Sequence, residues 1–437
     1  MKDTLREMIL EFHRSALPVM IHRDVEIPSL PSGVRKAFVF IGMRRVGKTF
    51  LMYQDMRQSL TFGLEKEKLL YLNFEDDRLS GFKVEDFQTI LDVYFQLYPH
   101  LVDAEDLRIY FDEIQNIDGW EKFIRRLLDK EKMTLFITGS SAKLLSKEIA
   151  TNLRGRCIEN EVFPLSLAEY LAHKGVVMQK TTSKDRSVIR HHSENYLIRG
   201  GFPETLDLSD SMHTQVIQSY VNSAVFRDVI DRHRLKRPDI VKLFLIHCLQ
   251  NIASPLSVTK VYNTFKSRGE ALGRGDLYEF LHYFEDAYLV CTVPLFEYST
   301  RKRQVNPSKI YCVDSGIIGS YSIKPETERS ARLENAVYIQ LRRMQFENIF
   351  YYKTALGKEV DFAAQYPNGK VELYQVSVDL SDEETRRREM SALVEAATAL
   401  ELKQAFVITT DTNETLEIDG LTIHVIPYWQ WALGTYL

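Results

Sequence analysis

The sequence AFVFIGMRRVGKTFLM, residues 37–52, defines the architecture of the first part of this chain. A short apolar run comes first, and a loop bounded by Gly42 and Gly47 then leads into a helical pattern. The loop fits G-x-x-x-x-G-K-[ST], in which glycines let the backbone fold around a phosphate group. Its place between a buried strand and a helix is the one this chemistry needs, because a helix N-terminus faces the anion.

The loop also supplies side chains for nucleotide chemistry. We expect Lys48 to pair with the β- and γ-phosphates and Thr49 to ligate Mg²⁺. The predicted cofactors are therefore ATP and Mg²⁺. The residues of this region expected to contact the nucleotide are Gly42, Arg45, Val46, Gly47, Lys48, Thr49 and Phe50.

A second motif, LRIYFDE at 107–113, ends in Asp112 and Glu113. An acid at the end of an apolar parallel strand lies at the carboxyl edge of the sheet, where ligands bind. We expect Asp112 to hold Mg²⁺ through water and Glu113 to act as the general base on the attacking water. The sequence lacks the guanine-specific N-K-x-D motif, so the pair favours an AAA-type ATPase over a GTPase.

The first part of the chain alternates apolar runs with helical stretches. The apolar runs are 37–42, 69–74, 107–113 and 134–140, and the helical stretches include 49–60 and 120–130. Near-continuous apolar runs predict strands that are buried on both faces of a parallel sheet. The predicted fold class is therefore α/β, with a doubly wound parallel-sheet core.

The rest of the chain changes character twice. Residues 165–250 have helical patterns, and 255–313 predict two helices followed by a two-stranded hairpin, the order of a winged helix. From 331 the α/β alternation resumes in a second, smaller domain. Its predicted elements are a helix at 332–345, strands near 348–353, 359–364 and 371–378, a helix at 383–400 and a strand at 405–409.

Composition and charge exclude several classes of protein. The chain has 437 residues, 45% hydrophobic, with a net charge of −4, and no apolar run reaches the roughly 18 residues of a membrane span. The four cysteines form no C-x-x-C pair, and the first residues lack a signal peptide pattern, so we expect a cytoplasmic protein with reduced thiols. The charge is uneven, at +5 over 211–310 and −6 over 331–437.

Two further features lie near the predicted sheet edge. Ser140 ends TLFITGS and is expected to hydrogen-bond the γ-phosphate or the water, unless it only forms a turn. Arg154 and Arg156 lie in LRGRC, before an apolar stretch that could be the last core strand. An arginine there commonly stabilises charge on a neighbouring subunit's γ-phosphate, which implies a homo-oligomer; surface salt bridging is the alternative. Arg156 is the preferred candidate because it adjoins the strand.

The match to a known family is wider than one motif. The segments IGMRRVGKTFLM, YLNFEDDRL, IYFDEIQNIDGWEKFIRRL, ITGSSAKLLSKEIATNLRGR, FPLSLAEYL and GGFPE occur in this order. Together they resemble the prokaryotic AAA+ ATPases that carry a C-terminal domain of unknown function. The resemblance implies an ATPase core over 1–164, a helical lid over 165–215, a helical and winged-helix-like module over 216–325 and a nuclease-like domain over 326–437. Gly201 and Pro203 in GGFPE resemble a Gly-x-Pro that contacts the nucleotide base, with a simple lid turn as the alternative.

The C-terminal domain resembles metal-dependent nucleases of the PD-(D/E)XK fold. These use an acid on the first helix, an Asp on one strand and (D/E)-x-K on the next, so that acids bind Mg²⁺ and the lysine orients water. The matching positions here are Glu334, Asp361, Gln375 and Ser377. Since the last two positions have lost the acid and the lysine, the site is expected to be degenerate and nuclease activity is doubtful.

Three functions follow from these patterns. The first is Mg²⁺-dependent ATP hydrolysis that moves the C-terminal modules. The second is a nucleotide-sensing switch with negligible turnover, which binds DNA or a protein partner. The third is an ATP-powered nuclease, with Lys353 or Lys358 standing in for the missing lysine. A DNA contact would use the basic middle region, whose cationic residues are Arg232, Arg234, Lys236, Arg237, Arg301, Lys302 and Arg303.

Overall fold

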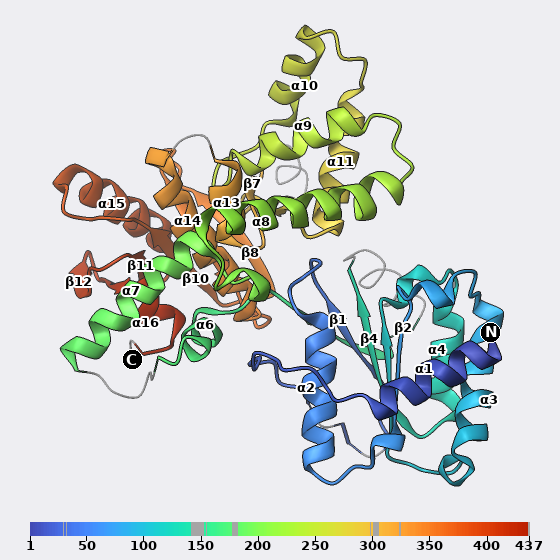
Figure 1. Ribbon diagram of the computed structural model, residues 1–437. Helices are drawn as coiled ribbons and strands as arrows, with labels where there is room; N and C mark the ends of the chain where they lie inside the picture. The colour runs from blue at the N-terminus through green and yellow to red at the C-terminus, as the bar shows by residue number, and fades with distance from the viewer. Residues whose placement is uncertain are drawn as a thin grey trace. The chain divides into compact units, whose positions relative to one another are not determined.

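The structure is a computed structural model, and the chain divides into two units, Met1–Phe163 and Pro164–Leu437, which are described separately (Figure 1). The residues described are 1–28, 30–31, 33–140, 153, 155–176, 182–297, 299, 306–322 and 325–435, without the side chains of 325–327. Arg154, Arg301, Lys302 and Arg303 therefore lie outside the described residues.

The first unit is built on a five-stranded parallel sheet in the order β2-β3-β4-β1-β5. Its strands are β1 (Ala37–Ile41), β2 (Leu69–Asn73), β3 (Leu107–Asp112), β4 (Met133–Gly139) and β5 (Cys157–Glu161). All five residues of β1 are buried, as expected for a strand that is covered on both faces. The α/β parallel sheet predicted from the apolar runs is confirmed, and β5 is the last strand expected after LRGRC.

Helices flank this sheet (Figure 1). They are α1 (Lys2–Arg14), α2 (Lys48–Thr61), α3 (Phe87–Leu97) and α4 (Trp120–Lys130). Along α4 the buried residues are Trp120, Phe123, Ile124, Leu127 and Leu128. This spacing places every apolar side chain of α4 on one face, which is why the segment forms an amphipathic helix against the sheet.

The second unit begins with helices. They are α6 (Leu167–His173), α7 (Ser183–Arg199), α8 (Asp210–Ala224), α9 (Pro238–Leu249), α10 (Val258–Ser267) and α11 (Arg274–Asp286). A π-helical stretch, Val225–Asp231, continues directly from α8. Next come the antiparallel strands β6 (Cys291–Val293) and β7 (Lys309–Tyr311). The predicted order of two helices and a hairpin is confirmed.

A six-stranded sheet in the order β12-β13-β11-β10-β9-β8 ends the second unit. The helices α13 (Ser315–Tyr321) and α14 (Pro325–Arg343) lead into it, followed by β8 (Asn348–Lys353), β9 (Glu359–Gln365), β10 (Val371–Val376), α15 (Glu383–Ala399), β11 (Gln404–Thr409), β12 (Glu414–Ile418), β13 (Leu421–Pro427) and α16 (Tyr428–Ala432). β8, β9 and β10 form an antiparallel meander, and α15 then crosses over to the parallel strand β11. The predicted elements to 409 are confirmed, while β12, β13 and α16 were not predicted.

The core of this sheet lies under α15. Leu393, Ala396 and Ala397 of α15 pack with Leu373 and Val407 of the sheet in one buried apolar cluster. Small alanines let the helix approach the strands closely, which favours dense packing. The cluster includes Val360 of β9 and Leu373 of β10, the two strands that carry Asp361 and Gln375.

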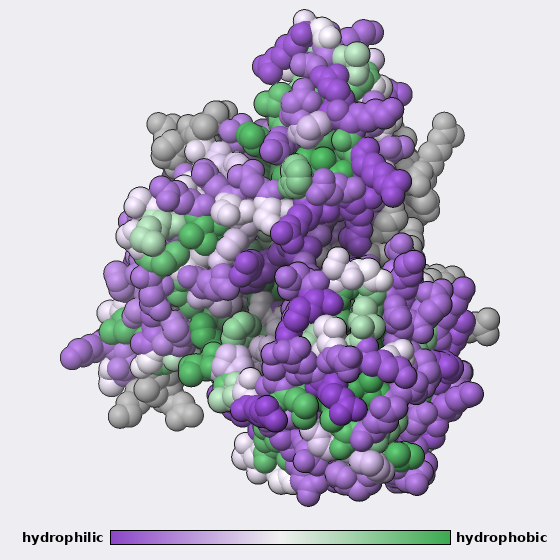
Figure 2. All heavy atoms as spheres, turned by 45° about the vertical axis from the view of Figure 1, so that its right-hand side comes forward, coloured by the Kyte–Doolittle hydropathy of each residue, from purple (hydrophilic) through white to green (hydrophobic). Residues whose placement is uncertain are grey.

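The surface is mostly polar on the face drawn in Figure 2, with apolar residues scattered between hydrophilic ones. Across the described part of the chain, none of the helices is both long enough and apolar enough to cross a lipid bilayer.

Candidate nucleotide site

The backbone of the loop after β1 has the shape that its glycines predict. Gly42 has φ +152°, and a Cβ at this position would lie 2.2 Å from the carbonyl oxygen of Val162. Gly47 caps α2 in a left-handed conformation, with φ 99°. A side chain at Gly42 would collide with the backbone, and one at Gly47 would strain the loop. These two glycines are therefore required by geometry.

Lys48 is buried at the start of α2 and points back into this loop. Its Nζ donates to the carbonyl oxygens of Gly42 and Met43, both at 3.1 Å. A carboxylate oxygen, Oε1 of Glu113, lies 3.7 Å from the same Nζ. Because two of these partners are neutral carbonyls and the ion pair is long, the lysine keeps positive charge available for an anion at the loop.

Asp112 ends β3 and lies beside Thr49. The Thr49 hydroxyl donates to Asp112 Oδ2 at 2.8 Å, Tyr71 donates to the same oxygen at 3.0 Å, and Thr138 donates to Oδ1. Burial and the neighbouring carboxylate of Glu113 raise the pKa of Asp112. A hydroxyl next to a carboxylate is the donor set that Mg²⁺ takes in phosphate sites, so these residues fit the expected ion.

Glu113 follows Asp112 in a left-handed conformation with φ 52°. Its N–H donates to the Thr138 hydroxyl at 2.9 Å, and Gln115 Nε2 donates to its Oε2 at 2.5 Å. Burial raises the pKa of Glu113, but the charge of Lys48 and the Gln115 hydrogen bond outweigh it, so that the pKa is lowered. A buried carboxylate held in this way is ionised at neutral pH and can accept a proton.

Ser140 lies just after β4 and is buried in the same place. Its Oγ is 3.4 Å from Gln115 Nε2, so Gln115 bridges Ser140 and Glu113. The Oε1 atom of Gln115 is buried without a hydrogen-bond partner within the described ranges. The structure thus brings together Lys48, Thr49, Asp112, Glu113 and Ser140, and it adds Gln115, which sequence reasoning missed.

Arg23 is a second residue that sequence reasoning missed. It lies in the extended segment between α1 and β1 and is 3% exposed. Nη1 donates to the carbonyl of Val46 in the loop at 2.8 Å, and Nη2 donates to the carbonyl of Phe163 at 2.7 Å. The guanidinium therefore supports the phosphate loop from behind. Its local sequence, HRDVEIP, gave no signal, because the contacts are distant along the chain.

Three other predicted residues, Arg45, Phe50 and Arg156, lie outside the buried cluster around Lys48. Arg45 is exposed with φ 68°, and Phe50 is 39% exposed on α2. Arg156 precedes β5 and forms an ion pair with Asp129 of its own chain. The action of Arg156 on a neighbouring subunit therefore stays a prediction, as does that of Arg154, which lies outside the described residues.

Gly201 and Pro203 belong to the second unit. The N–H of Gly201 donates to Asp314 Oδ2 at 2.7 Å, and a Cβ on Gly201 would lie 2.3 Å from the carbonyl oxygen of Leu165. Burial raises the pKa of Asp314 to about 7, although the N–H groups of Gly201 and Gly316 act to lower it. The turn is thus clamped by a carboxylate, and base contact by Gly201 and Pro203 stays a prediction.

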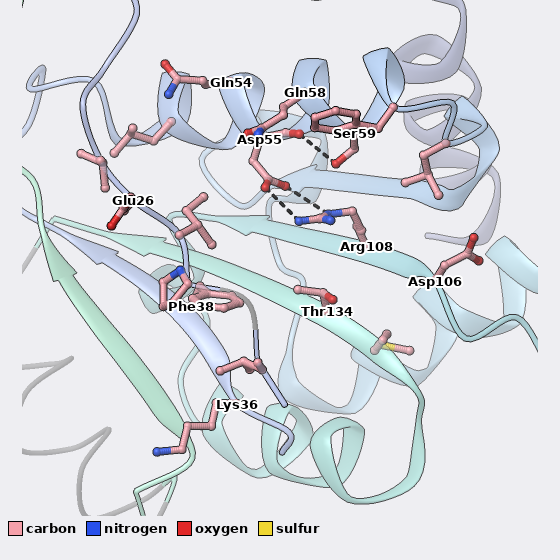
Figure 3. A pocket seen from close by; sticks show the side chains of 18 of the residues that line it. Glu26, Lys36, Phe38, Gln54, Asp55, Gln58, Ser59, Asp106, Arg108 and Thr134 are labelled. Atoms are coloured by element: carbon pink, nitrogen blue, oxygen red, sulfur yellow. Dashed lines mark hydrogen bonds and ion pairs between the residues drawn. The ribbon is translucent and has the colours of Figure 1, made fainter. Parts of the chain in front are cut away.

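A large hollow of about 1130 Å³ lies at the other edge of the first sheet, where the strands begin (Figure 3). In it Asp55 of α2 accepts two hydrogen bonds from Arg108, at 2.8 and 3.1 Å, and one from Tyr110 at 2.6 Å. Burial raises the pKa of Asp55, against the charge of Arg108. This cluster anchors α2 to β3 and so fixes the helix that carries Lys48.

The nuclease-like residues of the second unit do converge. The N–H of Asp361 donates to Gln375 Oε1 at 3.3 Å, and Lys309 Nζ lies 3.0 Å from Glu334 Oε1 and 2.9 Å from Asp361 Oδ1. Lys309 comes from β7, outside the segment that holds the candidates Lys353 and Lys358. Lys353 lies 3.8 Å from Glu359, a third acid that also contacts Lys309, and Lys358 pairs with Glu395.

Burial sets the electrostatics of this cluster. Burial and the charge of Asp361 raise the pKa of Glu334, while Lys309 and the Tyr311 hydroxyl oppose the shift. Burial also acts to lower the pKa of Lys309, but the carboxylates of Asp361, Glu334 and Glu359 raise it well above its ordinary value. The lysine is therefore charged within an acidic surrounding.

Comparisons with known proteins agree with this reading of the first unit. A family model described as an AAA domain matches residues 34–171. Two models described as domains of unknown function, DUF8612 and DUF4143, match residues 190–327 and 329–431. The parallel sheet, the phosphate loop and the Asp-Glu pair thus define a P-loop protein of the AAA+ class, a class that binds nucleotides.

Relatives extend the match to nearly the whole chain. Uncharacterized protein MJ1544 of Methanocaldococcus jannaschii is 32% identical over 425 residues, covering 95% of this chain and 91% of that protein. An uncharacterized protein of Haemophilus influenzae is 29% identical over 401 residues, covering 90% and 93%. The chain belongs to the same family as the M. jannaschii protein.

Solved structures resemble the chain only weakly. The Orc1 protein of Aeropyrum pernix in complex with DNA has a TM-score of 0.25 at 12% identity and covers 78% of this chain and 94% of its own. AMPPCP-bound DnaA from Aquifex aeolicus has a TM-score of 0.27 at 16% identity and covers 58% and 81%.

Proposed function

We propose that the first unit binds ATP with Mg²⁺ and hydrolyses it, and that nucleotide state moves the C-terminal modules. The observation that carries this proposal is the position of Glu113, an ionised carboxylate 3.7 Å from the loop lysine Lys48 and held by Gln115. When bound, Mg²⁺ would neutralise charge on the phosphates. Thr49 and Asp112 are the residues that would hold it.

The residues of the site divide the chemistry among them. The loop N–H groups and Lys48 bind the β- and γ-phosphates. Glu113 accepts a proton from the attacking water, and the oxygen of that water forms the new bond to the γ-phosphorus. The bond from that phosphorus to the bridging oxygen breaks, and ADP leaves. Gln115 orients the Glu113 carboxylate through its Nε2 atom, and the same atom lies 3.4 Å from the Ser140 hydroxyl.

The test is steady-state phosphate release by the purified chain with ATP and Mg²⁺. Lys48→Ala is expected to abolish turnover by preventing nucleotide binding. A matched control is Lys68→Ala, because Lys68 lies at the other sheet edge and pairs with Asp106. Unchanged phosphate release in Lys48→Ala would contradict the assignment.

The second candidate is a nucleotide-sensing switch with negligible turnover. The observation that favours it is the ion pair of Arg156 with Asp129 in the same chain, since a held arginine does not reach a neighbouring γ-phosphate. Activity per molecule measured against protein concentration separates the two. A rise with concentration that Arg156→Ala abolishes supports the oligomeric ATPase, and tight binding without turnover supports the switch.

The partner of either form could be DNA or a protein at the basic middle region. Two of the four acids of α11 face inward, since Glu285 accepts from Thr292 and Asp286 is buried, whereas Asp276 caps its own helix and Glu279 is exposed. The two inward acids lie away from a partner that binds the surface of this helix. Salt-dependent retention on duplex DNA, compared with and without ATP, tests the DNA alternative.

A further inference from the structure

The acidic cluster of the second unit holds an ammonium group where the resemblance to metal-dependent nucleases implies a metal ion. Lys309 Nζ lies 2.8 Å from Glu359, 2.9 Å from Asp361 and 3.0 Å from Glu334. The lysine is 2% exposed. Within the described ranges, no group of three or more His, Cys, Asp or Glu residues is arranged to hold a metal. The residues present therefore do not fit the expected ion.

The distances and donors suit an ammonium group. Nitrogen to oxygen distances of about 2.7–2.9 Å are typical of charge-assisted hydrogen bonds, whereas Mg²⁺ requires oxygen ligands at about 2.0–2.1 Å. A lysine has three N–H donors, and three carboxylates surround it. The Tyr311 hydroxyl donates to the same Oε1 of Glu334 at 2.7 Å, and the N–H of Val376 donates to the second oxygen of Asp361, Oδ2, at 2.9 Å.

We infer that Lys309 is a built-in cation, and that Glu334, Glu359 and Asp361 form with it a clasp that fastens β7 to the C-terminal sheet in place of a metal-dependent cutting centre. The inference is independent of the ATPase proposal, because all four residues belong to the second unit. We call these four residues the lysine clasp.

The two degenerate positions agree with this role. Gln375 Nε2 donates to Glu389 at 2.5 Å, and the Ser377 hydroxyl donates to the carbonyl of Asp379 at 2.9 Å. Both side chains are buried. The positions that would carry the acid and the lysine of a nuclease are thus engaged in internal hydrogen bonds.

The segment around the hairpin is tied to the sheet at a second point. The N–H of Phe296 donates to the carbonyl of Tyr351 at 2.7 Å, and the N–H of Tyr351 donates to Pro294 at 3.1 Å. The Tyr351 hydroxyl donates to the carbonyl of Pro307 at 2.7 Å. The residues that follow β6 and those that precede β7 therefore both meet β8, and the lysine clasp secures β7.

Removing Lys309 should leave buried carboxylates without compensation, which is strongly destabilising. We expect Lys309→Met to lower the Tm of the second unit's transition by about 10 °C. Adding Glu334→Gln and Asp361→Asn to this variant removes the repulsion and should recover part of the loss. The matched control is Lys353→Met, since Lys353 is 44% exposed and 3.8 Å from Glu359; its Tm should stay within about 2 °C of wild type.

The metal arm uses Mn²⁺ titration followed by electron paramagnetic resonance on the full chain without nucleotide. An Asp112→Asn background removes the candidate metal site of the first unit. We expect no Mn²⁺ binding at the clasp while Lys309 is present. One Mn²⁺ per chain that is lost on adding Asp361→Asn would overturn the inference.

The Tm measurements test the clasp whether or not Lys309→Met folds. An unchanged Tm in Lys309→Met contradicts the clasp. If Lys309→Met does not fold, recovery of folded protein in the triple variant supports the clasp, and failure of the triple variant to gain stability over the single variant contradicts it.

Discussion

Two buried lysines, one in each unit, lie beside acids near strand ends and serve different purposes. Lys48 donates to two neutral carbonyls at 3.1 Å and lies 3.7 Å from the Glu113 carboxylate. Lys309 touches three carboxylates at 2.8–3.0 Å. Lys48 therefore faces one carboxylate at a distance of 3.7 Å, whereas Lys309 is enclosed by three acids within 3.0 Å. The comparison teaches that local charge balance, rather than residue type, separates a candidate binding site from a structural cluster.

The largest expected effect is on ATP hydrolysis when Glu113, the carboxylate beside Lys48, is changed. Glu113→Gln should lower phosphate release by about 10²–10⁴-fold, because the general base is lost, while nucleotide affinity changes little. Single-turnover hydrolysis and nucleotide binding measured on the same protein check this. The counterpart Glu334→Gln in the lysine clasp should leave turnover unchanged, and equal losses in both variants would break the comparison.

The next effect is on the free energy of unfolding, which we expect to fall more on changing Lys309 than on changing Lys48. Lys309→Met should cost about 3–5 kcal/mol in the free energy of unfolding, because it leaves a buried charge cluster unpaired. Lys48→Met should cost less, since Lys48 mainly contacts carbonyls and one distant carboxylate. Urea unfolding monitored by intrinsic fluorescence gives both values. A larger loss in Lys48→Met would show that charge balance does not distinguish the two sites.

A smaller effect is expected at Arg23, which supports the phosphate loop without facing the predicted nucleotide. Arg23→Met removes the hydrogen bonds to Val46 and Phe163 and should weaken nucleotide affinity by about tenfold, at the lower end of the cost of charged hydrogen bonds. Fluorescent nucleotide titration checks it. Arg35→Met is the control, because Arg35 lies in the same segment but makes an exposed contact with Asp129 at 3.2 Å. Equal affinity in both variants would exclude a positioning role for Arg23.

The smallest expected effect is the contribution of Asp314 to the pH dependence of stability. It is small because many other carboxyl groups titrate in the same pH range. Burial raises the pKa of Asp314 to about 7 from its ordinary value of 3.8, so the folded chain binds more protons than the unfolded chain between these values. The stability of the second unit should therefore fall as pH rises from about 4 to about 7. Asp314→Asn should flatten that slope in unfolding curves recorded across the range. A slope identical to wild type would refute the assignment.

The sequence predicted the first site better than the second, and particular residues show why. Lys48 and Thr49 belong to one contiguous motif, and Asp112 and Glu113 end one strand, so strand and helix geometry alone placed them. The structure also brings Glu334, Asp361 and Gln375 together, which the sequence pattern alone left open. Their cation was missed, because Lys309 lies on a hairpin strand that no C-terminal pattern includes.

Arg23, Gln115 and Asp314 show the same limit. Arg23 donates to backbone carbonyls that are remote along the chain, and Asp314 accepts from the remote N–H of Gly201. Such backbone atoms leave no residue-type signature in the partner. Gln115 donates to the Glu113 carboxylate, which the left-handed backbone conformation of Glu113 turns toward it. Neither periodicity nor spacing could therefore have identified these three.

By itself, the sequence determined the parallel sheet, the phosphate loop and the acids at the sheet edge, because each depends on short-range patterns of apolar residues, glycines and charges. Only the tertiary structure decided which buried charges are neutralised. That outcome depends on distances of 3–4 Å between residues such as Lys309 and Glu334, which are 25 positions apart. Electrostatic energy depends on separation in space and on burial, and the folded chain alone sets both.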